Sequence, residues 1–215
     1  MINLGNSSMP QANAGGAVGA GGVINLSKGA KISLAKVAPA MHRCLIGLGW
    51  KTMEFDGSGD MDLDAAAFMV NANGRCSEDG FIFYNHLEDM AGSVRHHGDD
   101  LTGGSGGDDE QISIDLDKVP ANIDKIAITV TIFDPDNSKH QNFGMVDSAF
   151  VRIVNEDTGA EVIRYDLRED FSTEQAVTFI ELYRHNGEWK VDAVGSGFEG
   201  GLLKMCQHYG LNASY

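Results

Sequence analysis

The chain has 215 residues, of which 42% are hydrophobic, so it is long enough for one domain with a sizeable core. Its 31 acidic residues outnumber its 16 Lys and Arg and give a formal net charge of −15. This charge argues against nucleic acid as a partner and against unaided docking on anionic lipid, because both favour a basic surface. No hydrophobic run approaches the roughly 20 residues of a membrane span, so we expect no transmembrane segment.

Residues 1–22 are rich in Gly and Ala and contain no Lys or Arg. They lack the charged start and the hydrophobic stretch of a signal peptide, and we expect a disordered tail. The cysteines, Cys44, Cys76 and Cys206, are scattered without a CxxC spacing. An odd number of cysteines without a metal or redox motif is typical of a reducing compartment, so we place the protein in the cytoplasm.

From Val23 onward, short segments typical of strands follow one another, separated by turn signals. Polar and hydrophobic residues alternate clearly in 111–116 and 125–132, and Asn186-Gly187 is a strong hairpin signal. Many short strands at this spacing favour a β-sandwich or barrel over βαβ units. We predict an all-β fold, a two-sheet β-sandwich over 23–215. The predicted strands are 23–27, 31–36, 43–49, 61–70, 81–84, 111–116, 125–133, 149–154, 161–166, 176–184 and 189–194.

One short C-terminal helix is expected in addition to the strands. Leu202, Met205, Cys206 and Tyr209 recur at helical spacing, and Gly210 is a plausible C-cap. The sequence therefore predicts a helix that ends the domain.

Acidic segments are the most informative feature of the chain. Read as a strand, Asp60-Met61-Asp62-Leu63-Asp64 places three carboxylates on one face. Carboxylates about 6.8 Å apart repel by on the order of 2 kcal/mol per pair at an effective dielectric near 20. Solvent screening, raised pKa values or a bound cation would relieve this repulsion. Asp99-Asp100 and Asp108-Asp109-Glu110 flank a glycine-rich loop, and the cation is favoured if the fold brings these segments together; otherwise they form a solvated acidic edge.

Calcium is the cation that these groups suit best. It takes roughly six to eight oxygen ligands, and the glycines at 103–107 let backbone carbonyls approach closely. Asp60 and Asp64 would lie about 13.6 Å apart along a regular strand, so they cannot share one ion unless the strand bends. Two ions, or one ion and an outlying acid, follow from this geometry. The spacing is not that of an EF-hand, and magnesium, which prefers few protein ligands, stays an alternative.

Two further functional classes stay open at this point. A metal-dependent hydrolase could use the acidic cluster if one coordination position were open. A small-ligand module, for example for a nucleotide, is the other alternative. The glycine loop from Gly98 to Gly104 superficially resembles a phosphate loop, but no Lys-Ser or Lys-Thr follows it.

Eight phrases occur in order along the chain: INLSKG at 24–29, GLGW at 47–50, DLDAAAF at 62–68, FIFYN at 81–85, GDDE at 107–110, QNFG at 141–144, ELYRHNGEWK at 181–190 and GGL at 200–202. In these phrases, which span about 23–212, the chain resembles the TerD family of tellurium-resistance and stress-response proteins.

The resemblance implies a β-sandwich that binds two Ca²⁺ ions and has no catalytic activity. It implies partners among other tellurite-resistance proteins, in the cytoplasm or peripherally at the inner membrane surface. It implies that backbone carbonyls at 103–107 contribute to the ion sites. The ligand residues carried over by matching positions are Asp60, Asp62, Asp64, Asn85, Asp99, Gly107, Asp108, Asp109 and Glu110.

The chain departs from the family pattern at two positions beside these residues. Lys51 stands where family members often have Asp, and Asp100 stands where they often have Asn. Lys51 would weaken a cation site nearby, whereas Asp100 would strengthen one.

Overall fold

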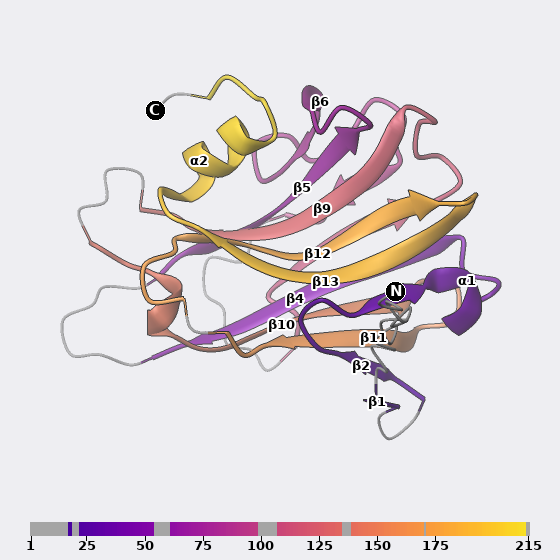
Figure 1. Ribbon diagram of the computed structural model, residues 1–215, viewed down its shortest axis with the longest axis horizontal. Helices are drawn as coiled ribbons and strands as arrows, with labels where there is room; N and C mark the ends of the chain where they lie inside the picture. Colours follow the sequence, from indigo (N-terminus) through magenta and orange to yellow (C-terminus); the bar gives the residue numbers. More distant parts are fainter. Residues whose placement is uncertain are drawn as a thin grey trace, which may run out of the picture.

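The protein is a sandwich of two mainly antiparallel β-sheets, here called sheet A and sheet B. The C-terminal helix lies on the outer side of sheet B (Figure 1). The structure, a computed structural model, describes residues 17–18, 22–53, 61–98, 107–134, 139–169 and 171–213. The predicted two-sheet sandwich with a short C-terminal helix is confirmed.

Sheet A has seven strands, and all but one of its neighbouring pairs are antiparallel. In the spatial order of the sheet, the second and third strands form the one parallel pair. That order is β1 (Ala17–Val18), β2 (Ile24–Leu26), β11 (Ala160–Leu167), β10 (Val146–Asn155), β4 (Arg43–Thr52), β8 (Glu110–Asp115) and β7 (Val94–His96).

Sheet B has six strands, all paired antiparallel. Their spatial order is β3 (Lys31–Ser33), β13 (Glu188–Phe198), β12 (Ala176–His185), β9 (Ile123–Ile132), β5 (Leu63–Asn71) and β6 (Cys76–Ile82). The short helices are α1 (Leu34–Val37), the 3₁₀ turn η1 (Phe143–Met145) and α2 (Gly201–His208).

The main core lies between the sheets and follows from alternation along the strands. In β4, Cys44, Ile46 and Leu48 are fully buried in this core, while Gly47 and Gly49 lie on the outer face. In β5, Leu63, Ala65, Ala67 and Met69 join the core. Each sheet therefore presents one hydrophobic face to the other.

A second, smaller core lies on the outer face of sheet B. Phe68 of β5 packs there with Met205, Cys206 and Tyr209 of α2 and the residue after it. The helix thus covers hydrophobic residues on the outer face of sheet B, and Figure 1 shows α2 on the outer side of this sheet. It ends one residue earlier than predicted, and Gly210 has the positive φ of 82° expected after a helix.

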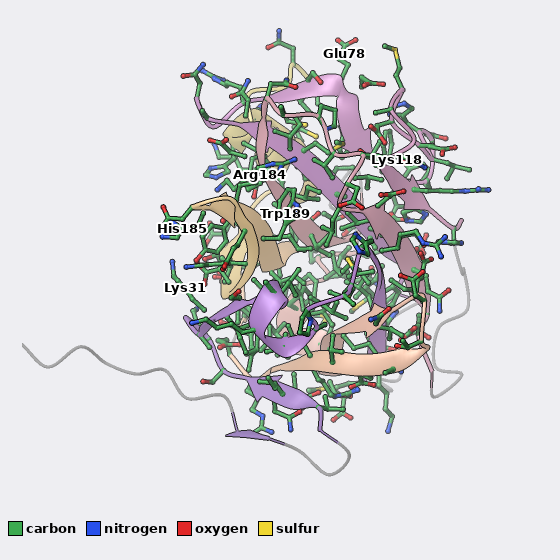
Figure 2. The ribbon with its side chains drawn as sticks, turned by 90° about the vertical axis from the view of Figure 1, so that its right-hand side faces the viewer. Lys31, Glu78, Lys118, Arg184, His185 and Trp189 are labelled. Atoms are coloured by element: carbon green, nitrogen blue, oxygen red, sulfur yellow. The ribbon has the colours of Figure 1, made fainter. Side chains whose placement is uncertain are left out.

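The hairpin between β12 and β13 closes the end of the sandwich opposite the acidic loops. Asn186 and Gly187 both have positive φ, as predicted. The Arg184 guanidinium lies 4.4 Å from the centroid of the Trp189 ring and donates to the carbonyls of Val119 (2.8 Å) and Ile123 (3.1 Å). Arg184 and Trp189 are marked in Figure 2. One side chain therefore ties the crossover between β8 and β9 to this hairpin.

Several local features differ from the predicted elements, among them the predicted strand 81–84, which is β6 at Cys76–Ile82 instead. Residues 34–36, expected to continue the strand 31–36, lie in α1 instead, with Leu34 buried in the main core. β7 was not expected, because three residues are too few for a visible alternation. Within 1–22, Ala17–Val18 pair with β2, and disorder of the remaining tail stays a prediction, since 1–16 and 19–21 lie outside the described residues. No helix in the described part of the chain is long and hydrophobic enough to cross a membrane.

Candidate metal centre at the acidic end

The strand ends that carry the acidic segments meet at one end of the sandwich. β5 begins at Leu63, opposite Ile132 at the end of β9, and the Asp62 carbonyl accepts a hydrogen bond from the Phe133 N–H (2.8 Å). β8 begins at Glu110, opposite Leu48 near the end of β4. The start of a strand in each sheet thus brings its acids to the same end.

Asp108 is held by an arginine in a notch on the outer face of sheet A. Its side chain is 1% exposed and accepts from Arg152 Nε (2.7 Å) and Nη2 (3.0 Å) and from Gln111 Nε2 (3.0 Å). The hydrogen bonds with Asp108 raise the pKa of Arg152. The carboxylate occupies the space where Gly47 lacks a side chain, and a Cβ there would overlap it. Asp108 therefore anchors the acidic loop to sheet A.

Asp109 ends the ladder between β8 and β4. Its N–H donates to the Leu48 carbonyl (2.7 Å), and its Oδ2 accepts from the Trp50 N–H (2.7 Å). The side chain takes the place of a backbone acceptor where the two strands separate. Asp109 is 7% exposed, so this carboxylate does not extend into solvent.

Glu110 connects the two sheets. It is 2% exposed, and its Oε2 accepts from the Ala65 N–H of β5 (2.6 Å) and from His96 Nε2 of β7 (3.2 Å). The Gly98 N–H donates to His96 Nδ1 (3.0 Å), so Nε2 is the nitrogen that carries the imidazole proton. A chain of hydrogen bonds therefore runs from the start of the glycine-rich loop through His96 and Glu110 to sheet B.

This contact brings the two acidic segments together. Ala65 follows Asp64 directly, and Asp64 is itself buried, at 7% exposure, in register with Thr131 of β9. Asp62 is half-buried beside Phe133. Among the described residues, no three His, Cys, Asp or Glu side chains lie close enough to hold a metal ion by themselves.

The other predicted ligands differ in how far the structure places them. Asp60 and Asp99 lie outside the described residues. Asn85 is exposed in the turn between Phe83 and His86, and the Gly107 carbonyl lies over Gly49. As ligands, all of these residues stay predictions.

Sequence patterns did not predict Arg152, His96 or Gly47 as residues of this end. Arg152 lies 44 residues from Asp108, and no local pattern links them. His96 and His97 differ in burial: His96 is 1% exposed, while His97 is exposed and its Nε2 lies 2.7 Å from the Ser113 hydroxyl.

Comparison with known proteins gives the family directly. The TerD domain matches residues 23–209. The chain belongs to the TerD family. This TerD domain is 54% identical to general stress protein 16U of Bacillus subtilis over 189 residues, which cover 87% of this chain and 97% of the relative. It is 54% identical to tellurium resistance protein TerD of Serratia marcescens over 192 residues, covering 89% and 99% of the two chains.

A solved structure supports the TerD fold. A homologue of telluride resistance protein (TerD) from Streptomyces coelicolor A3(2) superposes with a TM-score of 0.62. The match covers 77% of this chain and 95% of the homologue at 20% sequence identity. The sandwich is thus shared at low identity, while the curated relatives place the chain in the tellurium-resistance and stress-response family.

Proposed function

We propose that this TerD-family protein binds calcium at the acidic end and acts in stress response through calcium-ordered protein interactions, without catalysis. The observation that carries the proposal is the hydrogen bond from Ala65 to Glu110, which joins the acids around 62–64 to those at 108–110. Buried carboxylates that converge at one end of the sandwich favour a bound cation.

The donor set suits a hard cation. The proposed ligands supply oxygens from carboxylates, an Asn amide and a glycine carbonyl, which calcium prefers. Asp60, Asp62, Asp64, Asn85, Asp99, Gly107, Asp109 and Glu110 would share two ions. For Asp108 we propose a positioning part, because Arg152 already occupies both of its oxygens.

Calcium would change the surface that partners meet. The segments 54–60 and 99–106 carry many of the acids, and a divalent ion would reduce their mutual repulsion. Ordered loops would then form a docking surface for other tellurite-resistance proteins, in the cytoplasm or peripherally at the inner membrane surface.

Direct capture of an oxyanion such as tellurite by this end is disfavoured by charge. Reaction with the protein's thiols is disfavoured as well, because burial raises the pKa of Cys44 and Cys76 to about 12 and that of Cys206 to about 11. The thiolate is the reactive form, and these environments suppress it. An indirect part in resistance, through partners, is therefore the proposal.

Isothermal titration of the chelator-treated protein with Ca²⁺ tests the proposal. We expect binding heat in the wild type, a large loss of affinity in Asp64→Asn, and no change in Asp117→Asn, which alters an exposed acid at the other end of β8. At a hundredfold excess of calcium over Kd, the free energy of unfolding should rise by about 2.7 kcal/mol. Absence of both heat and a melting shift at millimolar calcium would discard the proposal.

A further inference from the structure

A cavity of about 300 Å³ lies on the outer face of sheet B, away from the acidic residues discussed above. Three segments form its walls: β6 with the residue after it, the turn that ends at His86, and the end of α2 with the residues that follow it. Figure 1 shows α2 and β6 on the same side of the molecule. This volume is at the lower end of the range of small-molecule pockets.

Aromatic rings form much of the cavity wall. Phe81 stacks between Phe68 and Phe83, with ring centroids 4.6 Å and 4.2 Å apart. Phe81 and Phe83 are half-buried, so both contribute to the cavity. Leu211 and the buried Cys206 add further apolar surface. A flat apolar group would find ring surface to pack against here.

The turn that carries His86 is firmly held. The backbones of Phe83 and His86 exchange two hydrogen bonds, of 3.0 Å and 2.9 Å. His86 Nδ1 lies 2.8 Å from the Phe81 carbonyl oxygen. A carbonyl only accepts, so Nδ1 carries a proton, and in the neutral tautomer Nε2 is the acceptor. The imidazole therefore has a fixed orientation before any ligand binds.

The charged residue that lines the cavity is an acid. Glu78 lies on β6 and is exposed, so its carboxylate can pair with a ligand at the rim. The net charge of −15 favours the approach of cations over anions. Arg75 is the basic residue nearby in the sequence; it packs against Gly210 and does not line the cavity.

We propose that this cavity binds a small, flat organic cation of the aryl-amidinium or aryl-ammonium class. The aryl ring packs against Phe83, and the cationic head donates to the Glu78 carboxylate and to His86 Nε2. The same chain already packs guanidinium groups on rings: Arg164 lies 3.9 Å from the Phe150 ring centroid. The proposal is independent of calcium binding at the acidic end.

Three probes of matched shape test the role of charge. Benzamidine is a flat cation, benzamide its neutral counterpart and benzoate its anionic one. Each is titrated into the full ¹⁵N-labelled chain while backbone amide shifts are followed. We expect benzamidine to bind in the millimolar range and to shift amides of Phe83, His86 and Leu211. Benzamide should bind more weakly, and benzoate should shift none of these amides.

Two charge-matched variants locate the binding group. Glu78→Gln should weaken benzamidine about threefold, as expected for one solvent-exposed ion pair. Glu88→Gln removes an equal charge from an exposed residue that does not line the cavity, and it should leave the affinity unchanged. Dispersed amide spectra confirm that both variants are folded.

Several results would overturn the proposal. One is the absence of amide shift changes around the cavity when benzamidine is present at millimolar concentration, about 20-fold or more above the protein. Another is equal binding of benzamidine and benzamide, which would mean that charge has no part. A third is equal weakening by both variants, which would point to the overall charge instead of this cavity.

Discussion

Replacing Gly47 by alanine is predicted to destabilise the protein through a residue 61 positions away in the sequence. The new Cβ would overlap the carboxylate of Asp108, which is 1% exposed and held by two hydrogen bonds from Arg152. Either the carboxylate moves and loses these bonds, or the strands β4 and β8 shift apart.

The expected loss follows from these contacts. Hydrogen bonds to charged groups contribute about 1.5–3 kcal/mol each, and overpacking a tight site costs about 1–3 kcal/mol. Arg152 is 31% exposed and also pairs with Glu161, so part of the ion-pair loss is screened or replaced. We therefore expect Gly47→Ala to lower the free energy of unfolding by about 3 kcal/mol.

Urea unfolding measures this loss, with the midpoint lowered and the slope unchanged. Gly107→Ala is the matched control, because a Cβ at Gly107 meets no atom of the described residues within 4 Å. In a double-mutant cycle, Asp108→Ala should cost much less in the Gly47→Ala background than in the wild type. A Gly47→Ala protein within about 0.5 kcal/mol of wild type, or strict additivity in the cycle, would refute the reasoning.

Three further predictions concern the rest of the molecule. Arg184→Ala should destabilise by about 2–3 kcal/mol, since two charge-assisted hydrogen bonds and the Trp189 contact are lost; His185→Ala, at the neighbouring exposed position, should be neutral in the same urea assay. All three cysteines are buried and free, so Ellman's reagent at pH 8 should modify the native protein far more slowly than the urea-unfolded chain, and equal rates would contradict the buried sites. Burial raises the pKa of Cys44 and Cys76 from 9.0 to about 12, so stability should be full below pH 9 and fall as pH rises from 9 towards 12; a flat profile across that window would contradict the predicted linkage.

Much of the fold could be predicted because its signals are local. Alternation in 111–116 and 125–132 corresponds to β8 and β9, and Asn186-Gly187 forms the predicted hairpin. The amphipathic spacing that ends at Tyr209 marks α2. The secondary structure of 34–37 was harder to predict, because the four residues Leu-Ala-Lys-Val are too few for hydrophobic periodicity to distinguish a helical turn from a strand.

The candidate site was predictable only in part. The sequence indicates which residues are acidic, but not which strand of one sheet faces which strand of the other. The bond from Ala65 to Glu110 depends on that packing. The part played by Asp108 also depends on packing. Its charge alone indicates a cation ligand, but in the fold its carboxylate pairs with Arg152. Such long-range pairs follow from topology and not from spacing in the sequence.

Anomalous diffraction from crystals grown with calcium tests the central claim most directly. We predict two calcium peaks at the acidic end, bordered by the segments around Asp64 and Glu110. The crystals would contain calcium at millimolar concentration. The claim would be contradicted if no anomalous peak lay within about 3 Å of these carboxylate oxygens.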